Sequence, residues 1–121
     1  MDDGVNIHKQ TWFKYFPGPI TVTDENAIII EMNEASAEMF KEEGGFALIG
    51  SSVIDCHPKS VQEKVRRIYD EKKPNVYSIQ KDGKKKLIYQ APIFEDEKFA
   101  GVVEMCLPLP EDVPHFNRDA D

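Results

Sequence analysis

The sequence predicts an α+β fold in which a five-stranded antiparallel sheet carries helices on one face. Two β-rich runs open the folding region, three more close it, and helical patterns lie between the two groups. Successive strands joined by short polar turns pair antiparallel, and helices grouped between such strands pack together on one face of the sheet.

Length and charge limit the organisation and the classes of partner. The chain has 121 residues, 40% of them hydrophobic, enough for one core but not for two. We expect residues 1–12 to form an N-terminal lead or helix, 13–107 the domain, and 108–121 a Pro-rich acidic tail. The net charge of −7 disfavours nucleic acids and anionic membrane surfaces as partners. We find no membrane span and no signal-peptide core, and two cysteines make no disulfide framework, so we expect a cytoplasmic protein.

The first strands and the first helix are predicted by local signals. Residues 20–23 and 27–32 are β-rich and flank a short polar turn, as in a hairpin. Asn33 follows at the position of a helix N-cap, where its side chain accepts a hydrogen bond from a first-turn amide. Glycines at 44–45 end this helix.

A longer amphipathic helix is predicted to begin at Ser60. Ser60 and Glu63 have the spacing of a capping box, in which each side chain pairs with a backbone amide at the helix start. Apolar side chains recur on one face, and Pro74 ends the helix.

Turns also define the last three strands. Residues 82–83, Asp-Gly, are the strongest short hairpin signal and predict strands over 75–81 and 84–94. A polar turn over 95–98 leads into a last strand over 99–107.

In this order, the elements over residues 13–107 resemble a PAS domain. The resemblance rests on Pro-Gly-Pro at 17–19, the first hairpin, Asn33, Leu-Ile-Gly at 48–50, the helix from Ser60, the Asp-Gly hairpin and Gly-Val-Val-Glu at 101–104. Residues 56–61 also resemble a PAS subgroup with a His-Pro-x-Ser-Val entry to the long helix. The resemblance implies a non-enzymatic sensor or interaction module whose sheet and helices enclose a small cavity.

Periodicity selects the residues that would line such a cavity. The candidates come from the two predicted helices, the segment between them, and the last two strands: Met39, Phe40, Ile54, His57, Val65, Ile68, Tyr69, Tyr89, Val103 and Met105. Each is also a plausible core residue, so the ligand stays unknown.

The cofactor classes of PAS domains differ in their motifs. Flavin-binding members carry an Asn-Cys-Arg-Phe-Leu-Gln-like segment soon after the glycine that matches Gly50, whereas here Cys56 comes three places late and the arginine is missing. Flavin is therefore not expected. Haem-binding members usually place a histidine within the long helix; His57 lies just before it, which keeps a haem-binding gas or redox sensor as an alternative.

Adjacent Cys56 and His57 also raise the alternative of a small Cys-His enzyme. Adjacent side chains rarely point at each other, so we expect no catalytic residues. The same reasoning removes Asp55, Cys56 and His57 as a metal site, because three consecutive residues do not easily converge on one ion.

The aromatic cluster before residue 17 suggests an interface. It comprises Trp12, Phe13, Tyr15 and Phe16. Aromatic residues are favoured in protein interfaces, and N-terminal helices of PAS domains often pack across a two-fold axis. We expect a homodimer that signals to a partner or a fused effector.

Overall fold

A computed structural model describes residues 9–119 of the chain. Residues 1–8 of the predicted N-terminal lead and residues 120–121 of the predicted tail lie outside the described residues. Within the described range, no helix has the length and apolar character needed to cross a membrane.

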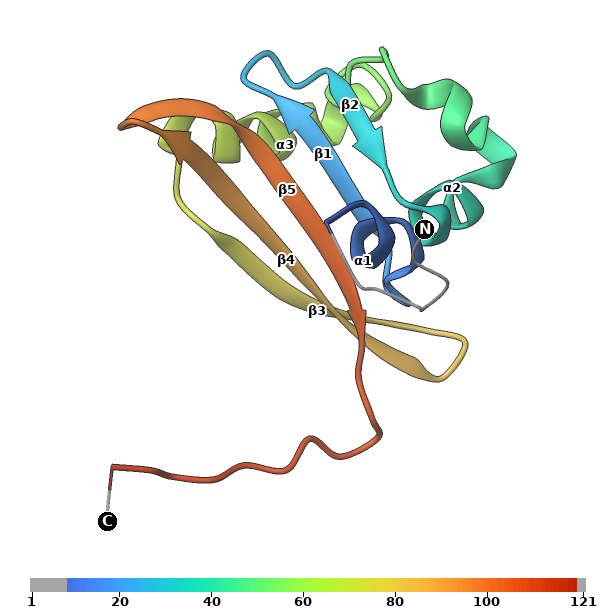
Figure 1. Ribbon diagram of the computed structural model, residues 1–121, viewed down its shortest axis with the longest axis vertical. Coiled ribbons are helices and arrows are strands. Elements are labelled where there is room, and N and C mark those ends of the chain that lie inside the picture. The colour runs from blue at the N-terminus through green and yellow to red at the C-terminus, as the bar shows by residue number, and fades with distance from the viewer. Residues whose placement is uncertain (1–8, 120–121) are drawn as a thin grey trace, which may run out of the picture.

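Five strands form one antiparallel sheet in the order β2-β1-β5-β4-β3 (Figure 1). The strands are β1 (Ile20–Asp24), β2 (Ile29–Met32), β3 (Asn75–Lys81), β4 (Lys84–Glu95) and β5 (Lys98–Pro108). The predicted α+β class is confirmed, and each predicted strand is found with its ends shifted by two residues or fewer.

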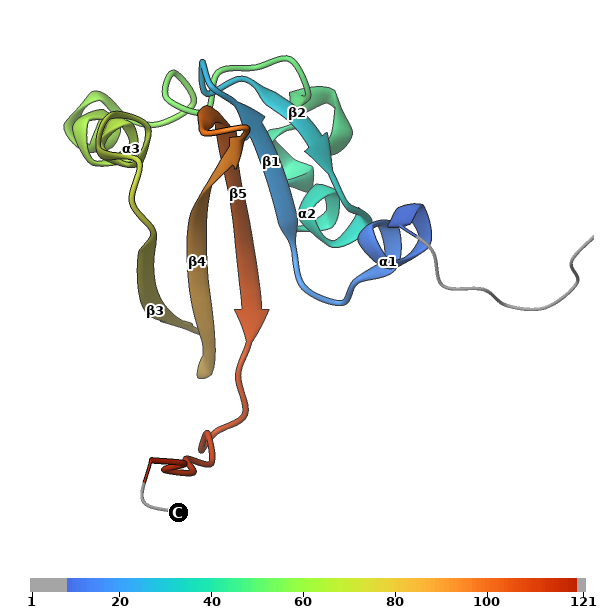
Figure 2. The ribbon, with the colours of Figure 1, turned by 60° about the vertical axis from the view of Figure 1, so that its left-hand side comes forward.

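The helices are short, apart from one. They are α1 (Lys9–Tyr15), α2 (Glu34–Met39), the 3-10 turns η1 (Lys41–Glu43) and η2 (Gly45–Leu48), and α3 (Lys59–Glu71). Figure 2 shows α3 and α1 on opposite sides of the sheet. We call the face that α2 and α3 contact the inner face and the other the outer face.

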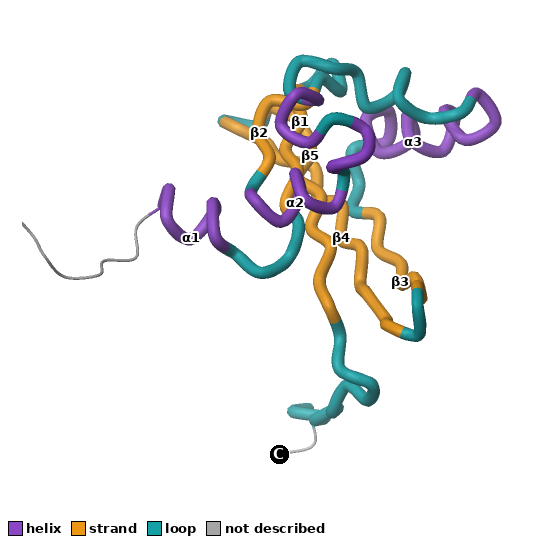
Figure 3. The backbone as a smooth tube through the Cα atoms, turned by 90° about the vertical axis from the view of Figure 1, so that its right-hand side faces the viewer, coloured by secondary structure: helices purple, strands orange, loops and turns teal. Residues whose placement is uncertain are grey.

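Both hairpins of the second half turn through two residues with positive φ. Asp82 and Gly83 have φ of 54° and 74°, which is the conformation that favours Asp-Gly in such turns. Asp96 and Glu97 likewise have φ of 50° and 69°, so this turn is shorter than the four residues predicted. β4 and β5 consequently pair over almost their whole length (Figure 3).

The predicted capping box at Ser60 is wrong. The N-cap of α3 is Pro58, which makes no side-chain cap hydrogen bond, and the helix begins at Lys59. Proline fixes φ near the helical value and has no amide to satisfy, so it starts the helix before Ser60 can act. The side-chain amide of Gln62 donates through Nε2 to the backbone carbonyl of His57 and connects the start of the helix to the preceding turn.

The core lies between the inner face and α2, and extends towards α3. Its buried apolar side chains are Ala27, Ile29, Met32, Ala37, Ile68, Ile88, Val102 and Cys106, whereas Ile20, which lies opposite Met105, is buried on the outer face. Only Ile68 of α3 is fully buried, and the side chains of β3 are exposed along the whole strand. The space between α3 and the sheet is therefore incompletely filled by protein.

Candidate functional site

A cavity of about 550 Å³ lies between α3 and the inner face of the sheet. Its lining comes from both layers and from the loop before α3: Thr21, Thr23, Val53, His57, Val61, Lys64, Val65, Ile68, Tyr69, Asn75, Tyr77, Gln90, Val102 and Glu104. Its volume falls within the usual range for small-molecule sites, about 300–1,000 Å³.

The helix and the sheet contribute different chemistry to this cavity. α3 presents the apolar side chains of Val61, Val65 and Ile68, which recur at helical spacing on one face. The inner face of the sheet is polar here. One side of a bound molecule would therefore meet aliphatic groups, and the other would meet hydrogen-bonding groups.

A row of hydrogen-bonded side chains crosses three strands on the polar side. The Asn75 amide donates to Gln90 Oε1 at 2.8 Å, and the Gln90 amide donates to Glu104 Oε2 at 2.6 Å. Register explains the row: Asn75 lies opposite Gln90, which lies opposite Glu104. Thr21 lies opposite Glu104 on the next strand, β1. We call Asn75, Gln90 and Glu104 the polar row.

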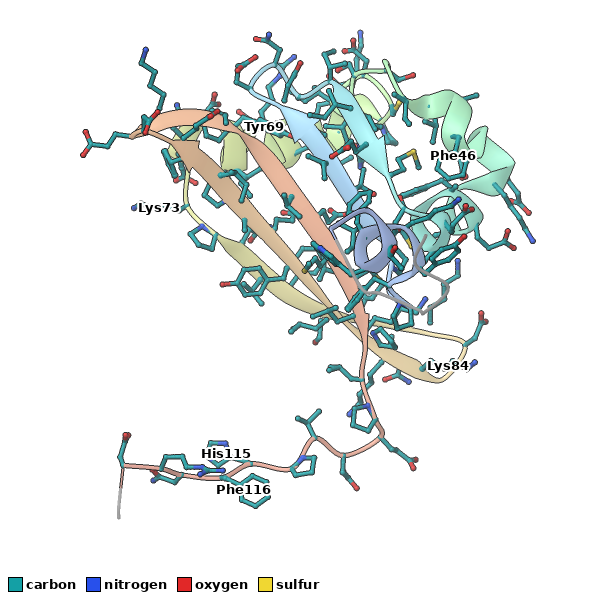
Figure 4. All side chains as sticks on the ribbon, in the orientation of Figure 1. Phe46, Tyr69, Lys73, Lys84, His115 and Phe116 are labelled. Carbon is teal, nitrogen blue, oxygen red and sulfur yellow. The ribbon has the colours of Figure 1, made fainter. Side chains whose placement is uncertain are left out.

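One hydrogen bond joins α3 to the sheet across the cavity. The Thr23 hydroxyl and the Tyr69 phenol are 2.5 Å apart (Tyr69 is labelled in Figure 4). Burial raises the pKa of Tyr69, the Thr23 hydrogen bond lowers it, and the negative charges of Glu104 and Asp24 raise it further. The phenol therefore keeps its proton more strongly in the folded protein than in the unfolded chain.

His57 lines the cavity with its imidazole orientation fixed. Nδ1 lies 2.6 Å from the carbonyl oxygen of Val53. A carbonyl only accepts, so Nδ1 carries a proton and donates it, and in a neutral imidazole Nε2 is then the nitrogen with the free lone pair. The ring is thus engaged with the backbone rather than with the neighbouring Cys56 thiol, which is exposed and free.

Four of the ten residues predicted to line a cavity do so: His57, Val65, Ile68 and Tyr69. Their binding of a ligand stays a prediction. Met39, Phe40 and Ile54 do not line this cavity: Met39 is the last residue of α2, Phe40 is its C-cap, and Ile54 lies in the segment before α3.

The assignment of the strand residues to the cavity is wrong. Tyr89 pairs with Met105, and Val103 pairs with Val22, whereas Gln90 and Glu104 occupy the alternate positions that face α3. Side chains alternate between the two faces of a strand, so Tyr89, Val103 and Met105 lie on the outer face. Apolar residues occur on both faces of β4 and β5, and periodicity alone therefore could not assign the inner one.

The polar row was missed at the sequence level, although a signal for it existed. Gln90 and Glu104 interrupt otherwise apolar runs in the middle of two strands. A polar residue at such a position needs a hydrogen-bond partner, and a pair of them on neighbouring strands predicts a polar patch. Asn75 carries no comparable signal, because it stands at the start of its strand.

Two further expectations concern a metal site and an interface. Within residues 9–119, no group of three or more His, Cys, Asp or Glu side chains could hold a metal ion. Trp12 and Tyr15 of α1 are 44% and 65% exposed, whereas Phe13 and Phe16 are half-buried. Whether these aromatic residues form an interface stays a prediction.

Alkaline pH provides a test of the Tyr69 environment. The folded state has the higher pKa, so this contribution to stability is fully present below the unfolded value of about 10 and is lost as pH rises through the folded pKa. We expect the free energy of unfolding of Tyr69→Phe to fall less steeply above pH 10 than that of the wild type. The difference should stay below about 1.4 kcal/mol per pH unit.

Urea unfolding between pH 8 and pH 11 measures this difference. Tyr15→Phe is the matched control, because the Tyr15 side chain is 65% exposed. Equal alkaline slopes for Tyr69→Phe and the wild type would contradict the expectation.

No protein-family model and no curated protein matches the sequence, whereas solved structures match its fold. A C-terminal domain from Streptococcus mutans is 21% identical, with a TM-score of 0.68 over 81% of this chain and 80% of that chain. The PAS domain of BvgS from Bordetella pertussis is 16% identical, with a TM-score of 0.60 over 84% and 83%. Aer2 of Vibrio cholerae, described as a dual PAS-heme oxygen sensor, is 13% identical, with a TM-score of 0.59 over 77% and 95%. The chain has the fold of PAS sensor domains, as its sequence predicts.

Proposed function

We propose that this PAS-fold chain is a non-enzymatic, cytoplasmic sensor module that binds a small molecule between α3 and the sheet. The cavity of about 550 Å³ carries the proposal, because an aliphatic wall faces hydrogen-bonding groups across it. Small-molecule sites typically combine a largely apolar lining with a few placed polar groups.

The Thr23–Tyr69 hydrogen bond supports a route from the cavity to the rest of the fold. It joins α3 to β1, and both side chains line the cavity. A ligand that competes for either hydroxyl changes how α3 packs on the sheet, and it shifts the population of the two packings by its differential affinity for them. The output would pass to a signalling partner or a fused effector.

Haem is a second candidate ligand, supported by the fixed imidazole of His57. Its Nδ1 donates to the Val53 carbonyl, as in many metal-bound histidines whose second nitrogen faces the metal. His57 would hold the iron, which would supply binding of a diatomic gas or a redox change. The polar row favours a small polar molecule over haem, because a porphyrin face offers its side chains no hydrogen bonds.

Homodimerisation is the second part of the proposal. Trp12 and Tyr15 of α1 are exposed, and the outer face carries Tyr89, 40% exposed, beside half-buried Val103 and Met105. Aromatic and methionine side chains are enriched in protein interfaces. A two-fold contact through α1 and the outer face would cover these apolar side chains and leave the cavity open on the opposite side of the sheet.

Native mass spectrometry of gently purified protein tests ligand and dimer together. We expect a dimer that retains added mass per subunit. Val65→Trp should lose that mass because the indole fills the cavity, whereas Arg66→Trp, on the exposed side of the same helix, should keep it. Far-ultraviolet circular dichroism checks that both variants fold.

The alternatives predict different results in the same experiment. Haem would appear as its own mass with a Soret band that His57→Ala abolishes. Added mass that survives Val65→Trp in a folded protein would contradict binding in this cavity. A monomer at micromolar concentration would contradict the dimer.

A further inference from the structure

The cavity contains one carboxylate without a basic partner. Glu104 is the only Asp or Glu among the described residues that line it. The ion pairs among residues 9–119 join Lys14 to Glu34, Lys41 to Glu38 and Arg67 to Glu71, and do not include Glu104. Lys64 also lines the cavity, but its side chain is exposed to solvent. Glu104 therefore forms no ion pair with a basic side chain of residues 9–119.

Glu104 also determines the direction of every hydrogen bond in the polar row. A carboxylate only accepts, so Gln90 must present its NH₂ group to Glu104 Oε2. Gln90 Oε1 then faces Asn75, which must in turn donate its own NH₂ group. The outward ends of the row are acceptors: Oε1 of Glu104 and Oδ1 of Asn75. In its neutral form His57 adds a third acceptor, Nε2, because its Nδ1 proton is donated to the Val53 carbonyl.

Neighbouring ionisable groups respond to the same charge. Burial raises the pKa of Tyr77 most, and the negative charge of Glu104 raises it further. The same charge contributes to the raised pKa of Tyr69. Both tyrosines line the cavity. The interior of the cavity thus favours positive charge.

Resting on the proposed sensor function, we infer that the ligand is a small organic ammonium ion. Its N–H groups would donate to Glu104 Oε1 and to the acceptors beside it. Its hydrocarbon part would lie against the aliphatic side chains of α3, Val61, Val65 and Ile68. A group that has several hydrogen-bond donors and no acceptor suits a site whose acceptors have no donor partner. An ammonium ion is such a group, because it has three N–H donors.

Matched probes separate charge from shape. The probes are 2-phenylethylamine, 2-phenylethanol and 3-phenylpropanoate, which share a skeleton and end in an ammonium, a hydroxyl and a carboxylate. We expect the amine to bind the wild type at least about tenfold more tightly than the alcohol, the effect of one charge-assisted hydrogen bond. The carboxylate should bind most weakly. Isothermal titration calorimetry gives the affinities, and chemical shifts of the Val65 and Val102 methyl groups show that the probe occupies the cavity.

Glu104→Gln tests the residue assignment. The substituted amide keeps the side-chain shape and can still accept from Gln90, so the polar row is retained. We expect the preference for amine over alcohol to fall to about twofold or less. Glu31→Gln is the matched control, because Glu31 is exposed on the outer side of β2, opposite Val22, and its loss changes the net charge equally. It should keep the wild-type preference.

The outcomes distinguish the ligand class from the sensor function. Equal binding of alcohol and amine in the cavity, or a preference that survives Glu104→Gln, overturns the ammonium assignment while the cavity still binds ligands. A co-purified anion identified by mass spectrometry would also overturn the ammonium assignment. Unchanged Val65 and Val102 shifts with all three probes, together with no retained mass, would overturn both proposals.

Discussion

Gly101→Ala should destabilise the domain by more than about 4 kcal/mol, which is exceptional for a single substitution. Gly101 lies in β5 opposite Asp24 of β1 and has φ of 151°. A Cβ atom added there would lie 2.0 Å from the carbonyl oxygen of Thr23 and 3.0 Å from the Cα of Asp24. Because these are backbone atoms of a central strand, no side chain can move aside, and β5 must separate from β1.

The substitution Gly101→Ala should disturb the cavity as well as the pairing of β1 with β5. Thr23, whose carbonyl meets the added methyl group, also holds Tyr69 through its hydroxyl. Urea unfolding followed by circular dichroism measures the change in the free energy of unfolding. A typical domain has a total of about 5–15 kcal/mol, so the variant should be largely unfolded or insoluble at 37 °C.

Gly83→Ala is the matched control for this experiment. Gly83 also has positive φ, 74°, but a Cβ atom there would meet nothing within 4 Å. Its substitution should cost only about 1 kcal/mol, the price of placing alanine in the left-handed region. Similar costs for both alanine variants would show that backbone strain, rather than contact between β1 and β5, is what Gly101 relieves.

Features decided within a few residues were predictable from the sequence. The Asp82–Gly83 turn and the start of α2 at Asn33 follow from the conformations and hydrogen bonds of the residues themselves. The capping box failed for a reason that is also local. The N-cap of α3 is Pro58, two residues before Ser60. The Ser-x-x-Glu pattern fits a helix start at Ser60, but it does not show which of the two N-cap positions the chain uses.

The cavity was only partly predictable because its sheet side depends on long-range register. The helical side, with Val65, Ile68 and Tyr69, follows from a 3.6-residue pattern that has one apolar face. β4 and β5 are apolar on both faces, so Tyr89 and Gln90 were equally plausible inner residues until pairing placed Gln90 beside Glu104. The residues that say most about the ligand's chemistry are therefore polar residues such as Gln90 and Glu104, which a search for apolar periodicity leaves out.

Asn33→Ala should lower the free energy of unfolding by about 3–5 kcal/mol, although the side chain is uncharged and small. Asn33 is 1% exposed and its Oδ1 accepts from the backbone amides of Ile20 and Ser36, both at 2.9 Å. Its Nδ2 donates to the carbonyl of Gly18 at 2.9 Å. Alanine would leave two buried amides and one carbonyl without these partners, and each such loss costs about 1–3 kcal/mol.

Graded substitutions separate the two roles of Asn33 in urea unfolding experiments. Asn33→Ser should recover only about 1 kcal/mol, because serine can cap α2 but is too short to hold Gly18 and Ile20 as well. Asn117→Ala is the control: Asn117 makes a similar backbone contact, to Asp119, in the exposed tail, and its loss should cost less than about 0.5 kcal/mol. If Asn33→Ala costs only the 1 kcal/mol of an ordinary N-cap, Asn33 does no more than start α2. A loss near 4 kcal/mol, with little rescue by serine, would show that this side chain joins the segment before β1, β1 itself and α2 into one cooperative unit.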